Sequence, residues 1–276
     1  MIVNALQKLK SFGFEPKNIL DIGANKGKWT LEIKKKVFPK AEYTLIEAID
    51  YEELEKLSVK HDNINYKNIL LDEIERLVTW YEKRNTGDSL FKENTGYFDD
   101  CKEIKRSATT IDLVFNKNEV FELIKIDCQG AEIPILKGGN SLVQKSSVII
   151  LEVPFMGEYN IGAPNFYEHI NYMENIGYRV FDIVELHRVD NILIQIDIIF
   201  IKQGHDFEKK VEKEIDIYKV AKEEAIKLGR IEPDEDDKKP IEVGPDGKVI
   251  IPSLYYADIG GMGPNSNKSF VSNIKG

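Results

Sequence analysis

The sequence predicts an α/β protein built on a doubly wound, mostly parallel β-sheet. Short runs rich in β-branched residues alternate with longer amphipathic stretches, which is the pattern of repeated βαβ units. A glycine-bearing turn begins at Gly23, directly after the first of these runs. The last two apolar runs are separated by only a short polar turn, which makes them antiparallel neighbours. We therefore expect a seven-stranded sheet with its last strand reversed and helices on both faces.

Each element follows from its own pattern. Residues 3–12 carry Ala5, Leu6, Leu9 and Phe12 on one side, which predicts an amphipathic helix. A polar, glycine-containing segment at 85–100 is long enough to suggest a functional loop. Strands of the sheet are expected at 18–22, 42–47, 64–70, 121–127, 148–153, 178–185 and 192–201, with a short extra strand at 75–81. Further helices are expected at 28–37, 52–59, 110–115, 132–137 and 166–176.

Composition excludes several classes of protein. The chain has 276 residues, 38 Lys and Arg against 47 Asp and Glu, and 42% hydrophobic residues, which suits a globular core. The net charge of −9 disfavours a nucleic-acid binder or a protein of anionic membranes. The apolar stretches are far shorter than the roughly 20 residues of a membrane span, so none is expected. The N-terminus does not resemble a secretory signal, so a cytoplasmic location is expected.

The chain is expected to divide near residue 204. Residues 1–204 hold the α/β pattern, whereas 205–276 begin with a charged helix at 206–228 and continue through a GPDG turn into a partly irregular end. Cys101 and Cys128 form no CxxC motif and the four histidines are scattered, so no metal site is predicted from them. A divalent cation remains possible only through carboxylates.

The sharpest local feature is the turn DIGANKG, which starts at Asp21 and links a strand to a helix. Gly23 and Gly27 let the backbone bend and let a ligand approach the exposed N–H groups. A dinucleotide-binding turn has a third glycine, which is missing here, so a pyrophosphate ligand is less favoured. An acid before the first glycine suits S-adenosylmethionine, which carries a sulfonium cation and a carboxylate that the loop amides can hold.

Glu47 ends the next strand, where a carboxylate can accept hydrogen bonds from both ribose hydroxyls. An acid at this distance from the glycine turn could equally well bind the ribose of NAD. An NAD(P)-dependent oxidoreductase of Rossmann type therefore remains an alternative. A non-catalytic binding protein on a methyltransferase scaffold is a second alternative.

A third cluster lies in LIKIDCQGAE, an apolar strand that opens into another glycine turn. Asp127 stands at the end of the strand and is therefore aimed at the cleft, and Glu132 falls in the first turn of the following helix. Glu152 lies inside the apolar run VIILEVPF, where a carboxylate must be paired, protonated or turned to the cleft. Cys128 is expected to be a buried small side chain.

In order and spacing, the strings DIGANKGKWT, LIEA, TTIDLVF, LIKIDCQGAEIPILKGG and ILEVPF resemble the FkbM-type methyltransferases, a branch of the class I S-adenosylmethionine-dependent enzymes. The resemblance covers roughly 18–202. It implies a Rossmann-like fold and transfer of a methyl group to a hydroxyl of a sugar, glycan or secondary metabolite. Residues 26 and 28 are lysines where the family usually has apolar or small residues.

The resemblance also implies roles for particular residues. It places cofactor binding at Asp21, Gly23, Ala24, Asn25, Gly27, Glu47, Ala48 and Asp72, the last of these near the adenine, and it places Asp127 and Glu132 on the second motif. Asp127 is the first candidate for a general base or acceptor-orienting group, and Glu132 is the second. Segments 87–98 and 154–167 are expected to recognise a small-molecule or glycan acceptor. If Asp127, Glu132 and Glu152 converged, a divalent metal could acidify the acceptor hydroxyl.

Overall fold

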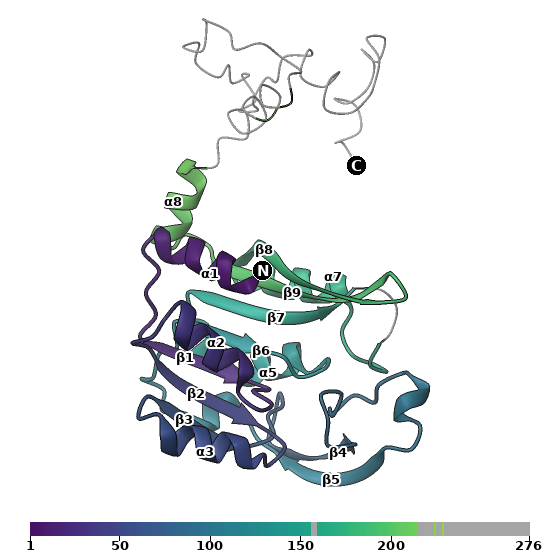
Figure 1. Ribbon diagram of the computed structural model, residues 1–276. Helices are drawn as coiled ribbons and strands as arrows, with labels where there is room; N and C mark the ends of the chain where they lie inside the picture. Colours follow the sequence, from purple (N-terminus) through teal and green to yellow (C-terminus); the bar gives the residue numbers. More distant parts are fainter. Residues whose placement is uncertain (156–158, 215–223, 225–227, 229–276) are drawn as a thin grey trace, which may run out of the picture. The chain divides into compact units, whose positions relative to one another are not determined.

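A computed structural model describes residues 1–155, 159–214, 224 and 228 (Figure 1). Its main sheet has seven strands in the order β3-β2-β1-β6-β7-β9-β8. All neighbours are parallel except the two pairs made by β9, so the expectation of a reversed last strand is confirmed. The strands are β1 (Asn18–Ile22), β2 (Glu42–Glu47), β3 (Ile64–Asn68), β6 (Leu123–Ile126), β7 (Val148–Pro154), β8 (Tyr178–Val189) and β9 (Ile192–Lys202).

Helices cover both faces of this sheet. One core cluster joins one face of the sheet to α4, α5, α6 and α7, and α1, α2 and α3 contribute buried residues that lie outside that cluster. Figure 1 shows α2 and α3 in front of the sheet. The helices are α1 (Ile2–Ser11), α2 (Lys28–Lys36), α3 (Glu52–Lys60), α4 (Ile111–Val114), α5 (Glu132–Gly138), α6 (Asn140–Val143), α7 (Phe166–Asn175) and α8 (Asp206–Glu214), with a 3-10 turn η1 at Gly96–Phe98.

The two central strands β6 and β7 are covered on both faces, which explains their nearly continuous apolar sequences. Each strand nevertheless carries one ionisable side chain, Lys125 on β6 and Glu152 on β7. Both side chains are buried, with 5% and 9% of their surfaces exposed. A charge in such a position needs a partner, and both residues lie toward the carboxyl ends of their strands.

An insertion between β3 and α4 forms a second, two-stranded sheet from β4 (Arg76–Glu82) and β5 (Lys102–Ala108). The extra strand expected at 75–81 is β4, whereas β5 was not predicted. The reason is that β5 reads KEIKRSA and is mostly exposed, so it lacks a strong apolar alternation. Strand β3 ends at Asn68 rather than at Leu70.

Contacts within the chain define two units, Met1–Lys210 and Val211–Gly276. Of the helix expected at 206–228, the structure describes α8 as far as Glu214. The rest of that stretch, apart from 224 and 228, lies outside the described residues, and so does the GPDG turn. Among the described residues, no helix is long and apolar enough to cross a lipid bilayer.

Candidate active site

A cavity of about 660 Å³ opens at the carboxyl ends of β1, β2 and β6. Strand β1 lies between β2 and β6. From β1 the chain first builds β2 and β3 on one side and later β6 and β7 on the other side, so the order of the strands reverses at β1. Ligands of open α/β sheets bind at such a switch point. The volume falls within the range typical of cofactor and small-molecule sites.

The first wall of the cavity is the turn between β1 and α2. Gly23 has a φ of +75° and a Cβ there would lie 1.9 Å from the backbone oxygen of Asp127, so the two turns touch through their backbones. Gly27 has a φ of +73°, and a Cβ there would lie 2.5 Å from the side chain of Leu57. Both positions therefore require glycine.

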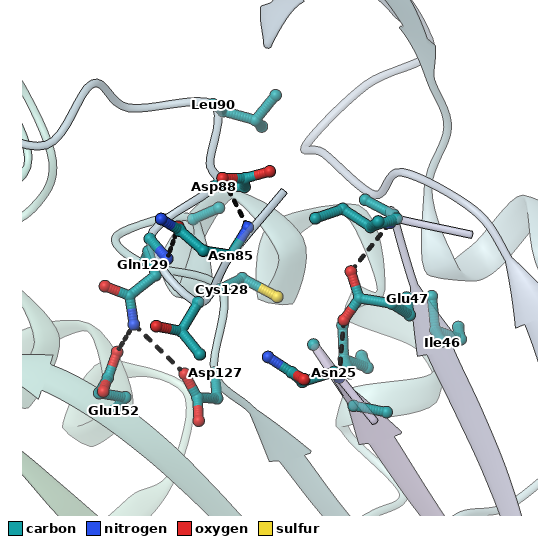
Figure 2. Close-up of a pocket in the computed structure, with 18 of the residues that line it drawn as sticks. Asn25, Ile46, Glu47, Asn85, Asp88, Leu90, Asp127, Cys128, Gln129 and Glu152 are labelled. Atoms are coloured by element: carbon teal, nitrogen blue, oxygen red, sulfur yellow. Dashed lines mark hydrogen bonds between the residues drawn. The ribbon is translucent and has the colours of Figure 1, made fainter. Parts of the chain in front are cut away.

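Glu47 connects this turn to the end of β2. One of its carboxylate oxygens accepts the backbone N–H of Asn25 at 2.7 Å, and the other accepts the N–H of Ile49 at 2.9 Å (Figure 2). Burial raises the pKa of this carboxyl group, and the backbone hydrogen bonds oppose that effect. Each oxygen has a further lone pair, so Glu47 can hold the loop and still accept a ligand hydroxyl.

Lys125 is flanked by the buried carboxylate of Asp21 and the partly exposed carboxylate of Asp127. It is the register partner of Asp21 across β1 and β6, and its Nζ lies 2.9 Å from Oδ2 of Asp127. Burial alone would lower the pKa of Lys125, but the charges of Asp127 and Asp21 outweigh it and raise that pKa. Burial would likewise raise the pKa of Asp127, but Lys125 outweighs it and holds that pKa below its usual value. Asp127 is therefore an anion held by a fixed cation.

Asp21 is fully buried at the floor of the site. Its Oδ2 accepts a 2.6 Å hydrogen bond from the hydroxyl of Thr30, while Oδ1 has no hydrogen-bond partner. Burial raises the pKa of Asp21, and the charge of Lys125 opposes that effect. The contact with Thr30 fixes the start of α2 on the end of β1, so Asp21 orders the glycine turn.

Beyond Asp127 the cavity is lined by a network of amides and a carboxylate. The side-chain amide of Gln129 donates to Oε2 of Glu152 at 2.5 Å and lies 3.5 Å from Oδ1 of Asp127 (Figure 2). Gln195 also donates to Oε2 of Glu152, at 3.2 Å. Burial and the neighbouring carboxylates of Asp127 and Asp197 raise the pKa of Glu152 well above its usual value.

The segment between β4 and β5 lies against the same cavity. The carboxylate of Asp88 accepts three backbone N–H groups, from residues 83, 84 and 85, which closes a tight turn. The hydroxyl of Ser89 donates to the carbonyl oxygens of Cys128 and Gln129 at 3.1 and 2.8 Å. This segment is therefore fastened to the turn that follows β6, and Figure 2 shows Asn85 and Asp88 beside that turn.

The structure places most of the sequence-predicted site residues on the cavity wall. Those that line the cavity are Asp21, Gly23, Ala24, Asn25, Glu47, Ala48 and Asp127. Gly27, Asp72 and Glu132 do not line it. Asp72 is 1% exposed and its Oδ2 accepts a hydrogen bond from Arg76 at 2.6 Å, so it faces the base of the β4–β5 insertion.

Glu132 is fully buried beneath the second glycine turn. Its Oε1 accepts the backbone N–H of Cys128 at 2.8 Å, and its Oε2 lies 3.8 Å from Nε2 of His169. Glu132 therefore does not converge with Asp127 and Glu152, an arrangement that the sequence had left open. Glu132 supports the turn from below, whereas the other two carboxylates face the cavity.

The sequence analysis assigned no site role to Lys125, Gln129 or Gln195, all of which line the cavity. Asp88, which also lines it, falls within the expected acceptor segment 87–98. Lys125 could have been found, because a lysine inside the apolar run LIKI needs an anionic partner. Cys128 was expected to be a buried small side chain, but it is partly exposed and lines the cavity. Desolvation raises the pKa of its thiol well above the usual value.

The order of the strands, the reversed last strand and the cavity at the switch point define a Rossmann-like protein of the methyltransferase type. Residues 21–180 match the family described as the methyltransferase FkbM domain. This match spans more than half of the chain, so the chain belongs to the FkbM methyltransferase family.

Solved structures with a similar arrangement are also methyltransferases. One is the 1,6-didemethyltoxoflavin-N1-methyltransferase of Burkholderia thailandensis, with 11% identity and a TM-score of 0.43, covering 72% of this chain and 76% of that one. Another is the magnesium protoporphyrin IX methyltransferase of Synechocystis, with 7% identity, a TM-score of 0.41 and coverage of 73% and 78%. No curated protein matches this chain.

Proposed function

We propose that this chain is an S-adenosylmethionine-dependent O-methyltransferase that acts on a hydroxyl of a sugar, glycan or small metabolite. The observation that carries the proposal is the acidic character of the cavity, which suits a sulfonium cation better than a pyrophosphate. Three lysines line the cavity, and Lys125 is already paired with Asp127 while Lys26 is paired with Glu53. Six carboxylates line it: Asp21, Glu47, Asp88, Glu93, Asp127 and Glu152.

Cofactor binding follows from three parts of the wall. The backbone N–H groups of the turn after Gly23 would hold the amino-acid carboxylate of the cofactor. Glu47 would accept the ribose hydroxyls with the lone pairs that its two backbone hydrogen bonds leave open. An apolar section suits the adenine and includes Ile49, Leu70, Leu71, Trp80 and Leu90.

Bound S-adenosylmethionine supplies a methyl carbon that is already activated toward nucleophiles. The protein has to align the acceptor oxygen with that carbon and remove a proton. As the new C–O bond forms and the C–S bond breaks, the hydroxyl proton becomes strongly acidic, so even a carboxylate of low pKa can accept it. Asp127 is an anion on the cavity wall and is the group that we assign to this task.

The far side of the cavity suits a polyhydroxylated acceptor. Amide groups of Asn85, Gln129 and Gln195 and the rings of Tyr97 and Tyr159 line it. Amides and carboxylates hydrogen-bond hydroxyls, and aromatic faces pack against the apolar face of a sugar ring. The expected acceptor segment at 154–167 contributes Tyr159 to this wall, and its residues 156–158 lie outside the described part of the chain.

We assign Glu132 to positioning rather than to proton transfer. Its buried contact with the N–H of Cys128 holds the turn that carries Asp127. We also leave Asp72 out of the cofactor wall, because it does not line the cavity and its buried carboxylate binds Arg76 and the N–H of Glu73.

The direct test is transfer of a labelled methyl group. S-Adenosylmethionine with a tritiated methyl group is incubated with the full chain and with fractionated glycans and small metabolites. Label that co-purifies with a hydroxylated compound, and that resists treatments cleaving esters, supports O-methylation. Label found on nitrogen, or in no fraction across a broad acceptor panel, contradicts the proposal.

Glu47→Gln is expected to weaken S-adenosylmethionine binding by at least about tenfold. Both carboxylate oxygens of Glu47 accept a backbone N–H. The NH₂ group of a glutamine at this position would face one of these N–H donors, so one charge-assisted hydrogen bond, worth about 1.5–3 kcal/mol, would be lost. Isothermal titration calorimetry measures the affinity. Glu55→Gln, at an exposed position on α3, is the matched control and should bind like the parent. Equal affinity for both variants would remove Glu47 from the cofactor site.

A further inference from the structure

A row of acidic side chains crosses the sheet where β6, β7, β9 and β8 lie side by side. Glu152 on β7 is the register partner of Asp197 on β9, and Asp197 is also the register partner of Glu185 on β8. Asp127 comes directly after Ile126, which pairs with Leu151 next to Glu152. Register thus brings four carboxylates into one line near the carboxyl ends of the parallel strands.

The charges in this row are not balanced by the nearby basic side chains. Lys125 is held by Asp127 at 2.9 Å. Gln129 and Gln195 donate hydrogen bonds to Glu152 but carry no charge. Lys125 acts on Asp197 and Glu152 as well, but its ion pair is with Asp127. The basic group that forms an ion pair with Asp197 is His187, whose Nε2 lies 3.5 Å from Oδ1 of Asp197. A half-exposed imidazole and the more distant, already paired Lys125 therefore face the buried carboxylates of Glu152 and Asp197.

Asp197 also has an oxygen that lacks a hydrogen bond. The residue is 6% exposed, and its Oδ1 is buried without a hydrogen-bond partner. A buried carboxylate oxygen without a donor is costly unless a cation satisfies it. The basic atom nearest to Oδ1 of Asp197 is Nε2 of His187, at 3.5 Å. One possible ligand atom from each of Glu152, His187 and Asp197 lies within 4.8 Å of the other two, so a cation could satisfy all three side chains.

We propose that Glu152, His187 and Asp197 bind a divalent transition-metal cation at the edge of the cavity. Two carboxylates and one imidazole form a donor set that suits Mn²⁺, Fe²⁺ or Zn²⁺. Magnesium and calcium prefer oxygen ligands alone, so they are disfavoured. Three protein ligands leave coordination positions open, which is the pattern of a catalytic rather than a purely structural metal site.

The surroundings fit this proposal in two further ways. Gln129 and Gln195 both donate to Oε2 of Glu152, so the carboxylate is oriented by neighbours in the manner of metal ligands with supporting hydrogen bonds. The site is also accessible, since the side chain of His187 is 44% exposed and both Glu152 and His187 line the cavity. If the proposed function holds, oxygen atoms of an acceptor in this cavity would be placed to complete the coordination.

Mn²⁺ binding to the full chain tests the proposal. The protein is treated with EDTA and desalted, Mn²⁺ is titrated in, and the free ion is counted by electron paramagnetic resonance. We expect one saturable Mn²⁺ per chain, and Zn²⁺ should displace it because Zn²⁺ stands above Mn²⁺ in the affinity order for such ligands. Asp197→Asn and His187→Ala should each weaken Mn²⁺ binding by at least about tenfold. Replacing a residue that only supports a metal ligand already costs about that much affinity, and removing the ligand itself should cost more.

Asp182→Asn is the matched control, because it removes the same charge from an exposed position on β8 and should leave Mn²⁺ affinity unchanged. Thermal unfolding without metal checks that each variant is folded. The proposal is overturned if the parent shows no saturable binding, if either ligand variant binds like the parent, or if Asp182→Asn weakens binding equally. Because neither cofactor nor acceptor is present, a negative result leaves the proposed methyl transfer intact.

Discussion

Asp127→Asn is expected to lower the rate of methyl transfer by about 10²–10⁴-fold, the usual contribution of a positioned proton acceptor. Affinity for S-adenosylmethionine should stay within about threefold, since the asparagine fits the same space and Lys125 keeps its second partner, Asp21. Single-turnover kinetics with saturating cofactor measures the rate, and calorimetry measures the affinity. An unchanged rate would refute the role of Asp127.

Glu132→Gln is the control that shows whether the loss of rate is specific to Asp127. The sequence presents Asp127 and Glu132 as alternative bases, but only Asp127 lines the cavity. Glutamine keeps an oxygen that can accept the N–H of Cys128, so the turn should survive. We expect turnover within a few-fold of the parent. A loss as large as that of Asp127→Asn would instead assign proton transfer to Glu132.

Gly23→Ala is expected to abolish S-adenosylmethionine binding or folding altogether. The added Cβ would lie 1.9 Å from the backbone oxygen of Asp127, and no side-chain rotation can relieve a clash with backbone. The turn after β1 would have to move away from the end of β6, which separates the two halves of the cavity. Calorimetry together with circular dichroism distinguishes loss of the site from loss of the fold.

Gly177→Ala is the control that distinguishes the effect of this steric clash from the effect of backbone strain alone. Gly177 also has a positive φ, of +86°, but a Cβ there would meet no atom within 4 Å. Its replacement should cost about 1–2 kcal/mol in the free energy of unfolding, the usual strain of a left-handed alanine, and should leave cofactor affinity unchanged. If Gly23→Ala were as mild as Gly177→Ala, the close packing of the two turns would be wrong.

Much of the fold follows from the sequence because strong patterns specify it. Strands β1 and β2 begin and end where the apolar runs predict, since buried parallel strands need almost every residue to be apolar. Strand β5 could not be predicted, because its residues are mostly exposed and it depends on pairing with β4, which is separated from it by a 19-residue segment, 83–101. Long-range pairing of this kind leaves little local signal.

The site was partly predictable for a related reason. Asp21, Glu47 and Asp127 could be placed because strand ends in a parallel sheet meet at one edge. The position of Lys125 beside Asp21 could not be predicted, because it depends on the register of β1 against β6. The position of Glu132 could not be predicted, since a side chain in the first turn of a helix can point toward the cavity or beneath the turn. Here it lies beneath the turn, where it packs against His169.

The central claim is that the cavity after Gly23 binds a sulfonium donor and not a nicotinamide dinucleotide. Isothermal titration calorimetry of the full chain with S-adenosylmethionine and with NAD, under identical conditions, tests it most directly. We predict a saturable one-to-one isotherm for S-adenosylmethionine and no binding heat for NAD. Heat with NAD alone, or with neither compound, would contradict the account.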